Sequence, residues 1–349
     1  YYRDRDIAWE AFKAGVMDYR IDARAATWAI GYDFPAYREG LVKRITVPDG
    51  QPSRMQAFVF NLRRDKFQDP RVREALNLTF DFPWLNANIF YATYKRTESY
   101  FQNSDMAAEG KPSDAELELL EPFRDVLPAR VFDEALPIDH PDDLRERLRL
   151  AYDLLIEAGY EVRDDTRVDA ESGRPLTVEV MLYDSGMERV VQPMLRNMSR
   201  LGIRGTLRIV DINQYLNRLR GFDFDIVVGQ FPQSNNPGNE QREYWTSEFA
   251  NSPQSRNLMG LENPAVDALV EQLIRADSRQ ELNTVARALD RVLRWSFITI
   301  PQYHSGETRI AVWDKFGYPQ PFPEYGLDLA AWWVDAEREA EINQRLRRR

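Results

Sequence analysis

The stretch that decides the fold is residues 176–228, which read LTVEVMLYDSGMERVVQPMLRNMSRLGIRGTLRIVDINQYLNRLRGFDFDIVV. Apolar runs alternate in it with longer amphipathic segments. In order, the stretch predicts a strand, a helix, a strand, a helix and a strand, at residues 176–183, 187–201, 206–210, 213–219 and 224–228. Strands that are joined by helices pair in parallel through right-handed crossovers. The stretch therefore predicts an α/β fold with a parallel sheet.

Capping residues mark further helices outside this stretch. Asp69 before Pro70 provides an N-cap followed by a proline in the first turn, and Ser278 with Glu281 forms a capping pair. The elements predicted there are helices from residue 70 and at residues 142–159, 264–275 and 279–295, strands at residues 57–61, 298–303 and 308–312, and a charged helix or tail at residues 337–349.

Composition limits the functions that the chain can have. Its 349 residues suggest two domains, and its 43% of hydrophobic residues suffice for a sizeable core. The net charge of −10 argues against general binding of nucleic acids or anionic membranes. No run of about 18 apolar residues occurs, so the sequence predicts no transmembrane helix. With no cysteine and only two histidines, His140 and His304, disulfides, cysteine-bound metals and multi-histidine metal sites are excluded.

Catalytic motifs are weak in this sequence. No glycine-rich phosphate-binding loop occurs, and carboxylate pairs such as Asp164-Asp165 arise freely in a chain with 29% charged residues. His304 lies near Ser305 and Glu307, which suggests acyl transfer, but no nucleophile elbow accompanies it and we interpret His304 as structural. We predict no catalytic residue, no metal site and no cofactor. A hydrolase that uses His304 or a carboxylate pair is the alternative.

A polar stretch follows the last strand of the central unit. Residues 230–242 read QFPQSNNPGNEQR, and Trp245 comes shortly after them. Ligands of open α/β sheets bind at the carboxyl ends of strands, where amides can exchange hydrogen bonds with a peptide-like backbone. Arg242 could hold a carboxylate or phosphate, and Glu240 could hold an amine or brace Arg242. The alternative is a simple turn made by Asn, Pro and Gly. The candidate ligand-binding residues here are Gln230, Gln233, Ser234, Asn235, Asn236, Asn239, Glu240, Arg242 and Trp245.

Aromatic residues in irregular segments are further candidates. Trp28 and Tyr32, and Tyr100 and Phe101 beside Asn103, lie in predicted loops rather than on periodic faces. Such side chains can form stacking surfaces or pocket walls. Packing in a satellite core is the equal alternative for each of them.

Several motifs together resemble a known family. Residues 58–61 (FVFN) and 67–77 (FQDPRVREALN), followed by Phe80-Asp81, resemble the entry to the second lobe of oligopeptide-binding proteins, the large solute receptors of ABC importers. Later motifs of the family are matched at residues 154–160 (LLIEAGY), 201–203 (LGI) and 222–225 (FDFD). Residues 95–104 (KRTESYFQNS) and 237–242 (PGNEQR) with Trp245 are similar to the YejA-like branch. The chain thus resembles a periplasmic oligopeptide-binding protein of extracellular solute-binding protein family 5.

The resemblance implies a two-lobed, type II-like periplasmic-binding-protein fold of the large peptide-receptor class. The chain should cross a hinge near residues 57–61 and 300–304, so Asn61, Tyr303 and His304 join the candidate ligand-binding residues. Family members have a long N-terminal portion of lobe I, which we expect to be missing from this chain. The expected division is residues 1–61 for part of lobe I and the first hinge strand, 62–299 for lobe II, and 300–349 for the second hinge strand, the return to lobe I and the C-terminal tail.

The same resemblance implies a non-enzymatic periplasmic receptor for oligopeptides, including peptide antibiotics of the microcin C type. It would close its lobes by hinge motion and deliver its ligand to the permease subunits of an ABC importer in the inner membrane. We expect a monomer with no nucleic-acid partner. Many such receptors have an Asp in the loop that matches residues 230–237, where it pairs with the ligand amino terminus. This loop has no Asp, so we expect recognition mainly by backbone hydrogen bonds and water. A chaperone-like binder of unfolded chains is a further alternative.

Overall fold

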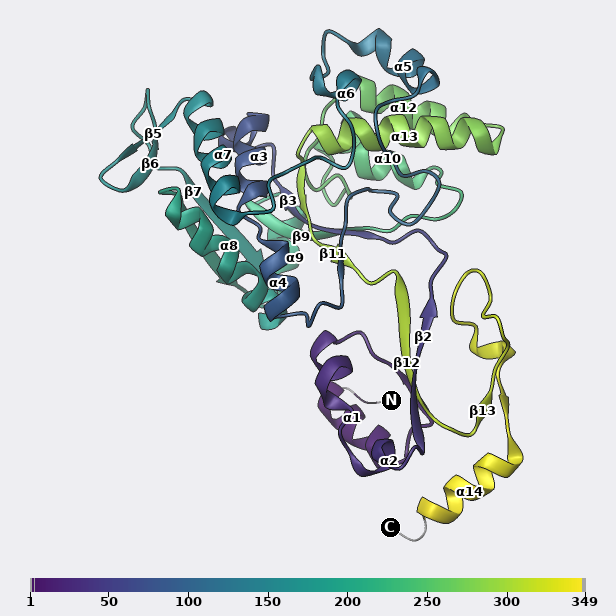
Figure 1. Ribbon diagram of the computed structural model, residues 1–349. Helices are drawn as coiled ribbons and strands as arrows, with labels where there is room; N and C mark the ends of the chain where they lie inside the picture. The colour runs from purple at the N-terminus through teal and green to yellow at the C-terminus, as the bar shows by residue number, and fades with distance from the viewer. Residues whose placement is uncertain (1, 3, 347–349) are drawn as a thin grey trace. The chain divides into compact units, whose positions relative to one another are not determined.

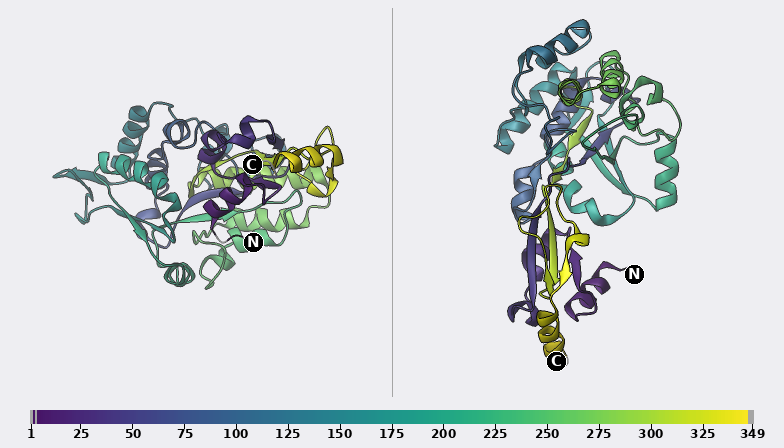
Figure 2. Two further views of the ribbon diagram at one scale, coloured as in Figure 1. Left: turned by 90° about the horizontal axis from the view of Figure 1, so that it is seen from below. Right: turned by 90° about the vertical axis from the view of Figure 1, so that its right-hand side faces the viewer.

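The computed structural model describes residue 2 and residues 4–346, and the chain divides into two compact units, whose course Figures 1 and 2 show. The first unit contains Tyr1–Gln51, Asn86–Lys95 and Ser305–Arg349, and the second contains Pro52–Leu85 and Arg96–His304. The short return to the first unit at residues 86–95 has no counterpart in the division expected from the sequence. The assignment of these units to the two lobes of a receptor stays a prediction.

A five-stranded mixed sheet forms the centre of the second unit. Its order is β10–β3–β9–β7–β8, with bounds Thr299–Pro301, Met55–Phe60, Ile226–Phe231, Thr177–Leu182 and Arg204–Ile209. β7 pairs in parallel with β8 and β9, which confirms the parallel arrangement predicted from residues 176–228. β3 joins antiparallel to β9, and β10 joins antiparallel to β3. Helical crossovers impose parallel pairing on the three local strands, whereas β3 and β10 arrive from distant parts of the chain.

The helices of the second unit follow the sequence pattern. α8 (Glu188–Arg200) and α9 (Ile212–Arg220) are the two crossovers. The other long helices are α3 (Pro70–Leu78), α7 (Leu144–Glu157), α12 (Pro264–Arg275) and α13 (Arg279–Trp295), and α12 and α13 run side by side in Figure 1. Asp69 caps α3, and Ser278 accepts a hydrogen bond from the Glu281 amide at the start of α13, as the capping signals predicted.

Shorter elements complete the second unit. They are the helices α5 (Asp114–Leu120), α6 (Arg130–Asp133), α10 (Glu240–Trp245) and α11 (Ser247–Ala250), the antiparallel pair β5 (Tyr160–Arg163) and β6 (Thr166–Asp169), and the strand β11 (Tyr303–His304). α4 (Phe82–Asn88) and β4 (Lys95–Arg96) each span a boundary between the units. A hydrophobic core joins buried side chains of the sheet, such as Val227, to α10, α12 and α13 through Trp245, Val266 and Leu289.

The first unit has its own sheet and core. Its three antiparallel strands have the order β1–β12–β2, with bounds Tyr19–Ile21, Glu307–Trp313 and Val42–Pro48. The core contains Phe12, Trp313 and Ile342. The unit also contains α1 (Arg5–Lys13), α2 (Pro35–Arg38), the pair β13 (Phe316–Gly317) and β14 (Trp333–Val334), and α14 (Ala336–Leu346).

The charged C-terminal helix predicted at residues 337–349 is present as α14, and its last three residues, 347–349, lie outside the described residues. Within the described part of the chain, each helix is too short or too polar to cross a membrane.

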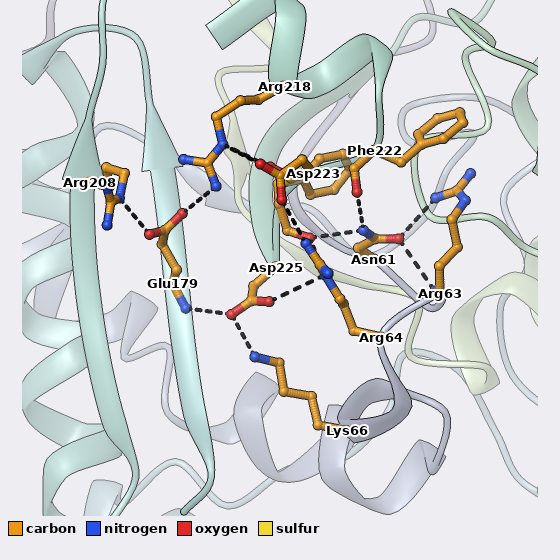
Figure 3. Close-up of polar contacts among 11 residues, drawn as sticks. Asn61, Arg63, Arg64, Lys66, Glu179, Arg208, Arg218, Phe222, Asp223 and Asp225 are labelled. Carbon is orange, nitrogen blue, oxygen red and sulfur yellow. Dashed lines mark hydrogen bonds and ion pairs between the residues drawn. The ribbon is translucent and has the colours of Figure 1, made fainter. Parts of the chain in front are cut away.

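Asn61 fixes the end of β3 against the start of β9 (Figure 3). Its side chain is fully buried, and its Nδ2 donates hydrogen bonds of 2.8 Å to the carbonyl oxygens of Phe222 and Phe224. Its Oδ1 accepts a hydrogen bond from Arg63 Nη1 at 2.9 Å. Two of the motifs that carry the family resemblance therefore meet in the fold. Asn61 braces the sheet, which corrects the expectation that it contacts ligand.

Charged residues extend this contact onto β7 (Figure 3). Asp225 accepts hydrogen bonds from Lys66 Nζ at 2.6 Å and from the Glu179 amide at 2.9 Å. The Glu179 carboxylate in turn binds Arg208 and Arg218, at 2.6 and 2.8 Å. Asp225 directly precedes β9, Glu179 lies within β7 and Arg208 lies within β8, and both carboxylates are paired with a Lys or Arg of the network. We therefore interpret the network as structural.

Replacing Asn61 with Ala is expected to lower the free energy of unfolding by about 2 kcal/mol, because a buried and a half-buried carbonyl oxygen lose their donor. Denaturant unfolding would measure the change. Asn213→Ala, at an exposed position of α9, is the matched control and should change stability by less than about 0.5 kcal/mol. Equal stabilities of the two variants would contradict the bracing role of Asn61.

Candidate ligand-binding site

The polar segment after β9 is shorter than the sequence suggested and is held partly by its own side chains. β9 continues to Phe231, so the loop itself covers residues 232–239. Gln233 and Gln241 exchange hydrogen bonds of 2.7 and 3.4 Å, and Ser234 Oγ accepts one from the Asn236 amide at 3.2 Å. The carbonyl oxygen of Asn235 accepts a hydrogen bond from Arg279. The polar side chains of this segment therefore also stabilise the turn, as the alternative interpretation predicted. The exposed polar side chains of the loop are Ser234, Asn236 and Asn239.

The last candidates of this segment lie on α10 rather than in a loop. Arg242 binds both carboxylate oxygens of Glu271, at 2.5 and 2.8 Å, and its Nη1 donates to Asn239 Oδ1 at 2.7 Å. Glu240 accepts a hydrogen bond from the Gly238 amide at 2.8 Å. The guanidinium of Arg242 is therefore engaged by Glu271 and not by Glu240, and this corrects the expectation that it offers an open fork to a ligand anion.

Trp245 belongs to the core of the second unit. Its side chain has no exposed surface, and its Nε1 donates to Gln241 Oε1 at 2.8 Å. The indole packs against the rings of Tyr100 and Phe231, with centroid distances of 4.9 and 4.8 Å. We expected Trp245 to anchor a ligand, but its burial gives it a packing role, because α10 folds this face of the helix onto the sheet.

Asp290 of α13 holds the irregular segment that carries Tyr100, Phe101 and Asn103. Its carboxylate accepts hydrogen bonds from Ser99 Oγ at 2.7 Å, from the Tyr100 amide at 2.7 Å and from the Ala108 amide at 3.0 Å. No sequence motif pointed to Asp290, because its partners are about 190 residues away in sequence. These three hydrogen bonds attach both ends of the segment 99–108 to α13.

The two aromatic residues of this segment face inward. Tyr100 is 1% exposed, its hydroxyl lies 2.8 Å from Thr299 Oγ1, and burial raises the pKa of its phenol. Phe101 has no exposed surface. Asn103, in contrast, is exposed and has a left-handed backbone conformation with φ of 64°. Phe101 therefore packs in the core instead of lining a groove.

Trp28 and Tyr32 belong to the first unit. Tyr32 is 5% exposed, and its hydroxyl donates to Asp22 Oδ2 at 3.1 Å. Trp28 is half-buried and meets Tyr32 edge to face, with ring centroids 5.5 Å apart. The pair takes part in the first-unit core, which is the satellite-core alternative considered for both residues. Burial raises the pKa of Tyr32 as well.

A row of three glutamine side chains crosses the sheet at the carboxyl end of β9. Gln230 Nε2 donates to Gln56 Oε1 at 2.9 Å, and Gln56 Nε2 donates to Gln302 Oε1 at 2.6 Å. Gln56 lies opposite Gln230 in the β3–β9 register, and Gln302 directly follows β10. Gln230 is exposed at one end of this amide row, and Gln302 is buried at the other. Sequence analysis found Gln230 but missed its two partners, since strand register cannot be deduced from distant segments.

Tyr303 and His304 follow the amide row along the chain. The Tyr303 hydroxyl lies 3.9 Å from the Met187 sulfur, and its ring stacks on Phe82. His304 Nδ1 lies 3.2 Å from Thr97 Oγ1, and both side chains of the pair Tyr303 and His304 are half-buried. In the described part of the chain, no three or more His, Cys, Asp or Glu side chains are grouped so that they could hold a metal ion.

The second unit thus combines a mixed α/β sheet with an amide-rich edge, and the first unit has a sheet and a core of its own. Residues 1–253 match the family described as "Bacterial extracellular solute-binding proteins, family 5 Middle". The chain belongs to this family. The resemblance drawn from its motifs is thereby confirmed.

Relatives of this family 5 protein agree with the YejA-like branch. It is 44% identical over 339 residues to the "Probable peptide-binding protein YejA" of Agrobacterium fabrum, covering 95% of this chain and 55% of that protein. It is 37% identical over 346 residues to the "Uncharacterized protein YejA" of Escherichia coli, covering 98% of this chain and 57% of that protein. The chain thus spans little more than half the length of the relatives that it matches.

Solved structures agree on the fold. The oligopeptide-binding protein AppA of Bacillus subtilis, in complex with a nonapeptide, matches 95% of the family 5 chain with a TM-score of 0.67 and 15% identity, over 58% of AppA. The murein tripeptide binding protein MppA of Escherichia coli matches 94% with a TM-score of 0.63 and 18% identity, over 56% of MppA. The α/β architecture of periplasmic binding proteins of this class, expected from the sequence, is confirmed.

Asp290→Ala is expected to lower the free energy of unfolding by about 3 kcal/mol, because three donors lose a shared buried acceptor. Amide exchange at residues 99–108 should accelerate more than exchange elsewhere in the second unit. Hydrogen-exchange mass spectrometry and denaturant unfolding would measure both effects. The control is Asp277→Ala, at an exposed position just before α13, which should stay within about 0.5 kcal/mol of the parent. Unchanged exchange at residues 99–108 would contradict the role given to Asp290.

Proposed function

We propose that this protein is the solute receptor of an ABC importer and that it binds oligopeptides. The observation that supports this most directly is the amide row of Gln230, Gln56 and Gln302, beside the exposed amides of the loop 232–239, in a family 5 chain. Amide side chains both donate and accept hydrogen bonds without carrying charge. Such an edge suits the alternating donors and acceptors of a peptide backbone and tolerates varied side chains.

The absence of an Asp from the loop shapes the proposed mode of binding. Without a fixed carboxylate at this place, the ligand amino terminus is not selected by ion pairing, and backbone hydrogen bonds and bridging water carry most of the affinity. Peptides of varied sequence, including peptide antibiotics of the microcin C type, then fall within the ligand class. One relative, 34% identical to this chain, is named "Peptidoglycan-binding protein YepA", so peptides from peptidoglycan belong among the ligands to be tested.

The proposed partners follow from the same function. The receptor would act in the periplasm as a monomer, close its two lobes over the peptide by hinge motion and dock on the permease subunits in the inner membrane. Binding and release alone accomplish this task, so no catalytic residue and no cofactor enter the proposal.

Mass spectrometry of compounds that copurify with the full-length protein should find peptides. Calorimetric titration with a recovered peptide would then test the site. Asn236→Ala or Gln230→Ala should weaken binding about fivefold, the equivalent of one lost hydrogen bond of about 1 kcal/mol. Gln272→Ala, at an exposed position of α12, serves as the control and should bind like the parent protein.

Other outcomes separate the alternatives. Recovery of the intact peptide after long incubation supports a receptor, whereas cleavage products would support a hydrolase. Weak binding to many denatured proteins, without saturable binding of short peptides, would support a chaperone-like protein. If Asn236→Ala and Gln230→Ala both bind like the parent, the proposed amide edge is not the peptide site.

A further inference from the structure

A cavity of about 550 Å³ inside the second unit is lined by three arginines from different elements. Arg96 comes from β4, Arg147 from α7 and Arg294 from α13. The remaining wall contains apolar side chains, such as Phe80 and Phe297, together with polar and acidic ones. None of these residues belongs to the loop 232–239 or to the amide row, so this cavity is distinct from the proposed peptide-binding edge.

Each of the three guanidinium groups has a buried nitrogen without a hydrogen-bond partner among the described residues. These atoms are Arg96 Nη1, Arg147 Nε and Arg294 Nη1. Arg147 is 7% exposed and is partly satisfied, since its Nη2 donates to Asp81 at 2.6 Å. Arg96 has one long contact, from Nη2 to Asn77 Oδ1 at 3.4 Å. Arg294 is 9% exposed. A buried donor that lacks a partner is costly and uncommon in folded proteins.

Arg291, one turn earlier on α13, is a buried arginine whose guanidinium has both a carboxylate and a carbonyl partner. It has no exposed surface, its Nε lies 3.2 Å from Glu116 Oε2, and its Nη1 donates to the Gly110 carbonyl at 3.0 Å. Among the residues that the structure describes, no carboxylate forms a salt bridge with Arg294. Its acidic neighbour on the helix, Asp290, already accepts three hydrogen bonds from the segment 99–108.

The charges around the cavity leave the arginines without full compensation. Burial lowers the pKa of Arg96 to about 9, and the positive charges of Arg294 and Arg147 act in the same direction. Three acidic residues also line the cavity, Glu98, Asp139 and Asp142. All three are exposed, and among the described residues none of them forms a salt bridge with the three arginines. Like charges held close together in a partly buried site favour the binding of an anion.

We propose that this cavity binds an oxyanion, either a carboxylate or a phosphate, through the guanidinium groups of Arg96 and Arg294. A guanidinium offers paired N–H donors that match two oxygens of such a group. The ring of Phe80, over which the Arg96 guanidinium lies at 4.6 Å from the centroid, helps to hold that side chain in place. The apolar side chains of the wall can contact the organic part of a small carboxylate or phosphate ester. The proposal does not depend on peptide binding at the loop.

The first test is calorimetric titration of the full-length protein with sodium phosphate and with sodium succinate, at ionic strength matched with chloride. We expect saturable binding of at least one of the two anions. Arg294→Gln and Arg96→Gln, which keep polar side chains but remove the charge, should each weaken this binding at least tenfold. Arg196→Gln, at an exposed position of α8 away from the cavity, is the control and should bind like the parent.

Thermal unfolding provides a second, independent measurement. The bound anion should raise the Tm of the parent protein by several degrees, because a ligand stabilises the state that binds it. It should raise the Tm of Arg294→Gln and Arg96→Gln much less. Should Arg294→Gln fail to fold, Arg96→Gln carries the test, since Arg96 is only half-buried.

A pair of otherwise identical tetrapeptides, one with a free carboxyl terminus and one with an amide, identifies the source of the oxyanion. Preference for the free acid that disappears in Arg294→Gln would assign the cavity to a peptide carboxylate, whereas equal affinities together with phosphate binding would assign it to a separate small anion. If neither phosphate nor succinate binds the parent saturably, or if both arginine variants bind like the parent, the proposal is wrong.

Discussion

Backbone pairing of β3 with its two neighbours is the interaction on which the rest of the second unit depends. β9 and β10 are separated by about 70 residues, and each forms an antiparallel ladder with β3, from which both are far in sequence. Without β3, the strand β10 would not belong to the same sheet as the parallel strands β7, β8 and β9. The same pairing aligns Gln56 with Gln230 and brings Gln302 beside them, so the amide row is a direct consequence of strand register. Asn61 then secures the far end of β3 against the segment that enters β9.

Helix α13 contributes the second constraint, because it carries three buried ionisable residues with different environments. Asp290 accepts hydrogen bonds from the segment 99–108, and Arg291 is bound by Glu116 and by backbone carbonyls. Arg294 forms no salt bridge with a carboxylate in the described part of the chain. Buried charges that have partners help to specify one packing arrangement, whereas an unpaired one is costly. Asp290 and Arg291 therefore have structural roles, whereas we assign Arg294, on the same helix, to ligand recognition.

The two candidate sites of the second unit differ in their chemistry. The amide edge offers neutral donors and acceptors and follows from the topology of an open α/β sheet, where loops at the carboxyl ends of strands converge. The arginine-lined cavity offers positive charge in a partly apolar setting, away from that loop. Uncharged recognition suits a peptide backbone of any sequence, whereas guanidinium groups select one charged functional group. In a receptor with both sites, the amide edge would provide affinity for peptides of any sequence, and the arginine-lined cavity would select ligands with one charged group.

The sequence by itself determined the order and type of the main elements, the caps of α3 and α13 and the family. These features depend on residues close together in the chain, such as apolar periodicity and the Asp69-Pro70 and Ser278-Glu281 signals. It also located the polar loop after β9. Only the tertiary structure decided which candidate side chains are accessible. Trp245, Phe101 and Asn61 looked available in the sequence, but contacts with distant segments bury them completely. The structure also revealed four site residues that no local pattern identifies, because strand register and burial depend on partners far away in sequence. These residues are Gln56, Gln302, Asp290 and Arg294.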